Sequence, residues 1–171
     1  MIEHYKSNAP DLFDPITFSG GTALHIAVCS KKEQPLKALL DILSAITTTI
    51  TTTTAAITTT RQNDFLKRGS YHGNTVLHHA TIYGNFEAVK LLVERYPDLV
   101  SITNKSGETP LFTAAEFDDT DIVRLLLESL SGQTVDHHLR CLPSIHCQRL
   151  DKVSILSAAI LGQHFGNNLS L

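Results

Sequence analysis

The sequence predicts an all-α solenoid of about four helix-turn-helix repeats, and three observations lead to this prediction. The phrase at residues 73–80 (GNTVLHHA) returns 34 residues later at residues 107–114 (GETPLFTA). The apolar runs that follow the two phrases also match in register. Weaker copies of the phrase begin at Gly20 and Ser154. Self-similarity at a period of about 20–50 residues is typical of stacked repeats, each of which buries its apolar face against a neighbour.

The composition restricts the possible functions. With 171 residues, 42% hydrophobic content and no Trp, the chain can form one domain with an aliphatic core. The net charge is −3 and no block of basic residues occurs, which argues against nucleic-acid binding. No apolar run approaches the roughly 18 residues of a membrane-spanning helix. Three sparse cysteines and the lack of a signal-peptide segment predict a reduced, cytoplasmic chain.

The first repeat begins at residues 20–27 (GGTALHIA), after an irregular segment that contains two prolines. Pro35 suits the first turn of a second helix, since it has no N–H group to leave unpaired. Leucines at the spacing of one helical face follow it, namely Leu36, Leu39, Leu40 and Leu43.

Residues 47–60 are almost entirely threonine. Threonine is β-branched and lowers helix stability, and the tract lacks the alternating polarity of a half-buried strand. We interpret it as a disordered, low-complexity insertion that forms a mobile loop. A role as a target of phosphorylation or glycosylation is the alternative.

Two regular repeats follow. In the second repeat, a short helix is expected from about Thr75 to Gly84. A second helix is expected from about Phe86 to Arg95, because the residue before Pro97 avoids helical geometry.

In the third repeat, Thr109 is the expected N-cap and Pro110 the first helical residue. Its second helix is expected from about Asp119 to Leu130, with acidic residues in the first turn. The glycine two residues before each threonine suits a turn that requires a positive φ.

The fourth repeat is weaker. A polar loop of residues 131–150 precedes it, Lys152 replaces the turn glycine, and the chain ends at Leu171 before a second helix could form. The predicted segments are an irregular N-terminal segment (1–19), repeat 1 (20–46), the Thr-rich insertion and linker (47–70), repeat 2 (71–104), repeat 3 (105–132), a polar His- and Cys-containing loop (133–150) and a partial repeat 4 (151–171).

The threonine–leucine–histidine–alanine phrase at this period resembles the ankyrin repeat, over most of residues 20–165. Segments 73–78, 85–92, 107–112 and 154–160 are also similar to plant ankyrin-repeat membrane proteins of the accelerated-cell-death and salt-tolerance type. Members of that group typically carry a C-terminal membrane (PGG) domain, which this sequence does not contain. The resemblance implies protein–protein binding, in plant defence or stress signalling. It also implies the cytoplasmic side of a membrane, if the chain is part of a longer membrane-anchored ankyrin protein.

His25 and His78 occupy the histidine position of the phrase. We expect each to bond near its own threonine and to the backbone of a neighbouring repeat, rather than to act as a general base. The sequence contains neither a phosphate-binding loop nor a nucleophile elbow, so we predict that it is not an enzyme and needs no cofactor.

One cluster has the chemistry of a metal site. It consists of His137, His138, Cys141, His146 and Cys147. Imidazole and thiolate are the usual zinc donors, but the two cysteines are too far apart to form a close chelating pair. We favour an ordinary polar loop, and binding of a metal through residues 137–147 is an alternative.

The expected partner is another protein. In ankyrin arrays the turn tips and first helices form a concave surface, so the resemblance implies a set of contact residues. The set comprises Tyr71, His72, Asn74, His79, Tyr83, Lys105, Ser106, Glu108, Thr113, Glu116 and Phe117. Tyr83 and Phe117 are the expected anchors, since aromatic side chains dominate interface energetics. Packing between repeats is the alternative for both.

The incomplete fourth repeat leads to a further expectation. Its apolar residues lack a covering helix, namely Ile155, Leu156, Ile160, Leu161 and Phe165. Terminal repeats usually present a polar outer face, so an apolar end predicts self-association.

Overall fold

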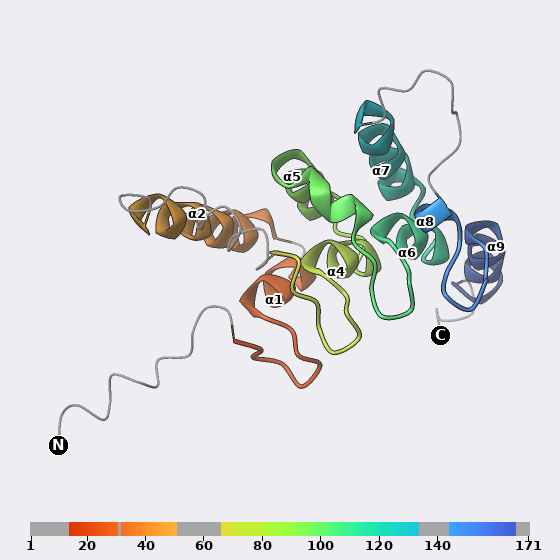
Figure 1. Ribbon diagram of the computed structural model, residues 1–171, viewed down its shortest axis with the longest axis horizontal. Coiled ribbons are helices and arrows are strands. Elements are labelled where there is room, and N and C mark those ends of the chain that lie inside the picture. The colour runs from red at the N-terminus through yellow and green to blue at the C-terminus, as the bar shows by residue number, and fades with distance from the viewer. Residues whose placement is uncertain (1–13, 31, 51–65, 134–143, 167–171) are drawn as a thin grey trace.

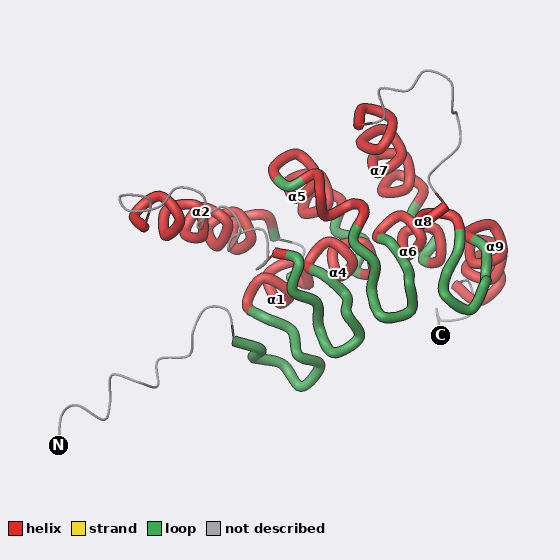
Figure 2. Tube along the Cα trace, viewed as in Figure 1, coloured by secondary structure: helices red, strands yellow, loops and turns green. Residues whose placement is uncertain are grey.

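The structure is a computed structural model that describes residues 14–30, 32–50, 66–133 and 144–166. Figures 1 and 2 show pairs of helices stacked side by side along the molecule, with extended loops along one edge. Within these ranges no strand occurs, and Gln148 and Ser154 form an isolated antiparallel bridge. The prediction of an all-α repeat fold is confirmed.

The helices form two layers. The first helices of the repeats make the inner layer: α1 (Ala23–Cys29), α4 (Val76–Ile82), α6 (Pro110–Glu116) and α9 (Ile155–Gly166). The second helices make the outer layer: α2 (Glu33–Ile50), α5 (Phe86–Arg95) and α7 (Thr120–Gln133). A 3-10 helix, η2 (Pro97–Ser101), and a short helix, α8 (Ser144–Cys147), lie in the connections. Each inner helix packs against the next one along the array, and α2, α5 and α7 do the same in the outer layer.

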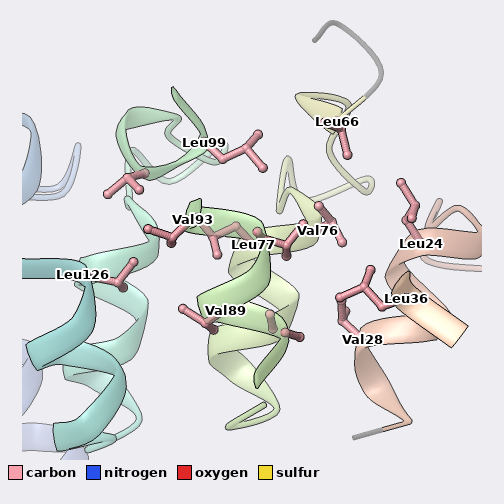
Figure 3. Packing of buried hydrophobic residues seen from close by; sticks show 14 of the residues in the cluster. Leu24, Val28, Leu36, Leu66, Val76, Leu77, Val89, Val93, Leu99 and Leu126 are labelled. Carbon is pink, nitrogen blue, oxygen red and sulfur yellow. The ribbon is translucent and has the colours of Figure 1, made fainter. Parts of the chain in front are cut away.

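The core lies between the two layers. Leu24, Leu77 and Leu111 occupy the same position in three successive repeats, and each is at most 4% exposed. Figure 3 shows Leu77 and Val89 among the aliphatic side chains that fill the space between neighbouring helices. This packing explains why the apolar residues recur at helical spacing, since each repeat is closed by its neighbours.

The outer helix of the first repeat is longer than we expected. Leu36, Leu40 and Leu43 are buried, as the leucine spacing predicts, but α2 continues through Thr47 to Ile50. The beginning of the Thr-rich tract is therefore helical and not part of a loop. The helix propensity of threonine is only about 0.7 kcal/mol below that of alanine, and a helix whose apolar face is already packed can extend over such residues. Residues 51–65, which include the rest of the tract, lie outside the described residues.

Two further features differ from the prediction. Helix α7 extends to Gln133, beyond the expected end at Leu130. The predicted polar loop also contains α8. Both segments lack the Thr-x-Leu phrase, so the repeat pattern does not mark them.

The turn before each inner helix has the predicted backbone conformation. Gly20, Gly73 and Gly107 have φ values of 77°, 79° and 81°. Lys152, which replaces the glycine of the fourth repeat, has a φ of 68°. A residue with a Cβ atom is strained in this region, so the fourth turn is formed at a cost of about 1 kcal/mol.

Backbone hydrogen bonds join the turn tips of successive repeats. The N–H groups of Tyr71 and Lys105 donate to the carbonyls of Ser19 and His72, at 2.8 and 3.0 Å. The N–H of Leu150 donates to the carbonyl of Ser106 at 3.0 Å. The tips of all four repeats are therefore hydrogen-bonded to one another in sequence.

Candidate protein-binding surface

The histidines of the repeat phrase are structural. In the second repeat, Nδ1 of His78 accepts the N–H of Thr75 at 3.2 Å, and Nε2 lies 2.9 Å from the carbonyl oxygen of Glu108 in the next repeat. His25 makes the equivalent contacts with Thr22 and with the carbonyl oxygen of Asn74, the latter at 3.0 Å. The expected pattern of own threonine plus neighbouring backbone is confirmed, and both ring nitrogens of each histidine are occupied.

Burial keeps these imidazoles neutral. It lowers the pKa of His78 to about 4 and also lowers the pKa of His25. The hydrogen bonds to the backbone carbonyls raise both pKa values, but by less than burial lowers them. Neutral histidines whose ring nitrogens are all engaged in backbone or threonine contacts have no free site for proton transfer with a substrate.

The third repeat obtains its histidine from elsewhere. Phe112 stands at the histidine position and is buried, and its phenyl ring has no polar atom that could bond the hydroxyl of Thr109. Instead, Nδ1 of His146, from α8, lies 3.2 Å from the hydroxyl of Thr109. The His146 side chain is 1% exposed, and burial lowers its pKa. An imidazole from the irregular loop therefore contacts Thr109, in place of the histidine that this repeat lacks at position 112.

This contact bears on the metal-binding alternative. Of its five candidate ligands, His146 and Cys147 are described, and the ring of His146 already contacts Thr109. His137, His138 and Cys141 lie outside the described residues. Among the residues that the structure describes, no group of three or more His, Cys, Asp or Glu side chains could hold a metal ion.

The two predicted anchors lie at the same position in successive repeats. Tyr83 and Phe117 each follow the last residue of an inner helix, α4 and α6 respectively. Their side chains are 44% and 54% exposed. About half of each aromatic side chain is therefore exposed to solvent.

The His79 ring packs against the ring of Tyr83. The His79 and Tyr83 rings stack with their centroids 6.2 Å apart, and the His25 ring meets His79 edge-on at 4.9 Å. Neither ring nitrogen of His79 has a hydrogen-bond partner among the described residues, and both are buried. Burial and the neighbouring histidines lower the pKa of His79 to about 4. The ring therefore acts as a neutral, mainly apolar platform.

The Tyr83 hydroxyl interacts with Cys29 of α1 across the repeat boundary, and this interaction raises the pKa of Tyr83. The Cys29 thiol itself donates to the carbonyl oxygen of His25 at 3.0 Å. Burial is the main reason why the pKa of Cys29 is also raised. Tyr83 thus contacts His79 and interacts with Cys29, while 44% of its surface stays exposed.

Some of the predicted contact residues at the turn tips are exposed, and others are hydrogen-bonded within the array. Tyr71, His72, Lys105 and Ser106 are exposed. The Tyr71 ring lies over Gly20, where a Cβ atom would come within 2.6 Å of it.

Asn74 and Glu108 belong to a hydrogen-bond network instead. The amide of Asn104 donates to Asn74 Oδ1 at 2.8 Å and to Glu108 Oε2 at 2.7 Å. Arg149 pairs with Glu108 Oε1 at 2.9 Å and also with Asp151, whose pKa it lowers to about 2. The Glu108 side chain is only 12% exposed, so most of its surface is covered within the array.

The last two predicted residues differ in burial. Thr113 is 3% exposed, and its hydroxyl donates to the carbonyl of Thr109, so its side chain is packed inside the array. Glu116 is partly exposed beside Phe117, and burial together with the nearby Glu108 raises its pKa. Glu116 is therefore accessible to a partner, whereas Thr113 is not.

Sequence reasoning missed three residues of the third and fourth repeats. Arg149 fixes Glu108, Leu150 covers Gly107 at the tip, and His146 bonds Thr109. The tip position of Leu150 could have been found, because it precedes Ser154 by the same four residues that separate Tyr71 from Thr75. No periodic signal marks Arg149 or His146, since both lie in the irregular connection.

Comparison with known proteins agrees with this architecture. A family model for ankyrin repeats (three copies) matches residues 55–140, which is half of the chain. The chain therefore belongs to the ankyrin-repeat family. It is also 35% identical over 117 residues to the B-cell lymphoma 3 protein homolog of Mus musculus. That match covers 68% of this chain but 22% of the relative, so the chain spans about a fifth of the relative's length.

Two further predictions concern the kind of protein. Among the described helices, none is both long and apolar enough to cross a bilayer. Ankyrin repeats are typically non-enzymatic binding modules. The common function of this architecture is to bind other proteins.

Proposed function

We propose that the chain binds another protein through the inner surface that Tyr83 and Phe117 share with the exposed tips. We call this set the inner surface, and it comprises Tyr71, His72, His79, Tyr83, Lys105, Ser106, Glu116 and Phe117. The observation that carries the proposal is the half-exposure of two aromatic rings at equivalent positions of consecutive repeats. Exposed apolar side chains that recur at one surface are typical of protein-interaction sites, and aromatic side chains contribute strongly to such interfaces.

The chemistry of the inner surface indicates the kind of partner. The described tips carry Lys105 and His72, and the helix ends carry Glu116 and Asp118 beside the aromatic rings. Such a surface has an apolar centre and a rim of mixed charge, which is the anatomy of a non-obligate protein interface. A partner that places one or two apolar side chains against Tyr83 and Phe117 fits it best.

The resemblance stated from the sequence supports a biological setting. We propose a cytoplasmic binding module in plant defence or stress signalling, in which a longer protein of the same type would be membrane-anchored. The supporting observation is the similarity of segments 73–78 and 107–112 to that plant group. Tagging the protein in plant cells and following its location during pathogen or salt stress would test this setting separately from the binding surface.

Proximity labelling with the intact protein tests the binding surface. We expect a set of labelled proteins that is lost when Tyr83 and Phe117 are both changed to Ala. Phe86 is 38% exposed on the outer helix α5, and Phe86→Ala is the matched control that should retain the labelling. Equal labelling by the double variant and the wild type would refute the inner surface as the binding site, provided that both have the same circular dichroism spectrum.

A further inference from the structure

A half-exposed apolar side chain of helix α9 lies in the register of the two aromatic anchors. Tyr83 and Phe117 lie eight residues after the threonine that opens each phrase, and Leu161 lies seven residues after Ser154, which replaces that threonine. The three side chains are 44%, 54% and 52% exposed. We call Tyr83, Phe117 and Leu161 the apolar row. The first repeat has Ser30 in this register, so the row extends over repeats 2 to 4.

This register is a surface position of the repeat. The outer helices α5 and α7 follow Tyr83 and Phe117 along the chain, and both rings nevertheless stay half exposed. Leu156 lies five residues before Leu161, at the position of the buried Leu77, and is therefore about 140° away around the helix. The apolar row and the Leu156 side of α9 are thus different faces.

The spacing of the row follows from the stacking of the inner helices. Helix α4 packs on α6, and α6 packs on α9, so the three lie side by side (Figure 1). The axes of packed helices are about 8–10 Å apart. The array therefore offers one large apolar side chain about every 8–10 Å, along a line that crosses the inner helices.

This interval restricts the conformation of a segment that contacts every member of the row. A polyproline II helix returns to the same face every three residues, which is about 9.3 Å. A β-strand returns to the same face every two residues, or about 6.7 Å, and does not match. An α-helix matches at every seventh residue, about 10.5 Å, but its apolar stripe also brings the side chains at i+3 or i+4 against the surface.

The charged groups beside the row disfavour such a continuous apolar stripe. Glu116 precedes Phe117 and is partly exposed, and Asp118 follows it and is exposed. Neither forms an ion pair within the part of the chain that the structure describes. An apolar stripe would desolvate these carboxylates without pairing them. A polyproline II segment places only every third side chain on the row, so a neighbouring position can hold a Lys or Arg that pairs with them.

We infer that the partner of the inner surface is a proline-rich segment in the polyproline II conformation. It crosses repeats 2 to 4 with an apolar side chain at every third residue and a basic residue next to the one that contacts Phe117. Exposed aromatic rings suit this partner, since proline-rich segments dock on aromatic-lined surfaces. The inference rests on the proposed function, and it adds the class of partner and Leu161 to that function.

A fluorescein-labelled peptide of sequence PPLPRLPPLPP is the probe, because its leucines recur every three residues and an arginine lies beside the central one. We expect saturable binding to the full chain by fluorescence anisotropy. The isomer PLPLRLPPPPP has the same composition with leucines at every second residue, and it should bind about tenfold more weakly. Equal binding of the two peptides, or no binding of the first, would overturn the inference. Tighter binding of an alanine-rich helical peptide with leucines at every seventh residue would also overturn it.

Variants of the chain test the two recognition elements. Leu161→Asp should weaken binding of the first peptide by about tenfold or more, because a charge would be buried in the apolar contact. Leu156→Asp, at a 74% exposed leucine on another face of the same helix, is the matched control and should bind normally. Glu116→Gln should weaken binding by about two- to fivefold, and it should have no effect when the arginine of the peptide is replaced by glutamine. An equal effect of Leu161→Asp and Leu156→Asp would contradict the apolar row.

Proximity labelling with the intact protein separates this inference from the proposed function. We expect Leu161→Asp to remove the same labelled proteins as the double variant Tyr83→Ala, Phe117→Ala, and Leu156→Asp to retain them. Labelling that is lost in the double variant but kept by Leu161→Asp would overturn the inference and leave the inner surface as the binding site. Labelling that the double variant retains would overturn both.

Discussion

The Nε2 atom of His78 lies 2.9 Å from the carbonyl oxygen of Glu108, and this hydrogen bond joins the second repeat to the third. Since a carbonyl oxygen accepts, the proton is on Nε2, and Nδ1 accepts the N–H of Thr75. A second proton would have to enter at Nδ1, directly opposite that N–H group. One neutral tautomer of one buried side chain therefore holds a turn, a helix start and a repeat boundary together.

This relationship predicts a loss of stability in mild acid. The pKa of His78 is about 4 in the folded chain and about 6.5 when unfolded, so the unfolded state binds more protons between these values. Stability should thus be fully present above pH 6.5 and decrease as the pH falls towards 4, by up to about 3 kcal/mol from this group. The lowered pKa values of His25 and His146 act in the same direction.

Urea denaturation at a series of pH values measures this effect. His78→Gln should have a lower free energy of unfolding at pH 7 and a shallower decrease between pH 6.5 and 4. His72→Gln, at an exposed tip, should retain the wild-type profile. Parallel profiles for the wild type and His78→Gln would contradict the assignment.

The bond between His146 and Thr109 predicts that the irregular loop contributes to stability. His146→Ala should lower the free energy of unfolding by about 2 kcal/mol, because it leaves a cavity and removes a hydrogen bond. Ile145→Ala, at a 40% exposed neighbour, should have a much smaller effect. Equal effects of the two substitutions in thermal or urea denaturation would show that the contact is not important.

The turn conformations predict substitutions of opposite sign. Gly107→Ala should destabilise the chain by at least about 1 kcal/mol, because φ is 81° and the new Cβ would lie 2.6 Å from Leu150 Cγ. Lys152→Gly should stabilise it by a few tenths of a kcal/mol up to about 1, because it relieves the strain at a φ of 68°. Melting temperatures of the two variants test both predictions, and a destabilising Lys152→Gly would indicate that the lysine side chain makes a favourable contact.

The ion pair between Arg149 and Glu108 predicts coupling between the third and fourth repeats. The two side chains are 27% and 12% exposed. A double-mutant cycle with Arg149→Met and Glu108→Gln should give a coupling energy of about 1–2 kcal/mol. The pair of Arg124 and Asp121, which is 72% and 74% exposed, is the matched control and should give a coupling close to zero.

The regular part of the molecule could be predicted from the sequence because its information is local and repeated. Thr75 and Thr109 mark the helix starts, Gly73 and Gly107 mark the turns, and helix α5 begins and ends at the predicted residues. The role of the phrase histidines was also predictable, since each bonds within its own phrase and to the next repeat. These features recur in register, so a comparison of the sequence with itself exposes them.

The rest was decided by contacts between residues without such a register. Helix α2 extends into the Thr-rich tract because its leucine face is packed, and a propensity cost of about 0.7 kcal/mol per threonine does not prevent this. His146 replaces the missing phrase histidine, and Arg149 holds Glu108, although neither belongs to a repeated pattern. The exposure of Tyr83 and Phe117 depends on which neighbours are present. The sequence by itself therefore determined the repeat fold and its general class of function, and only the tertiary structure decided which apolar residues remain exposed, because exposure depends on packing between repeats.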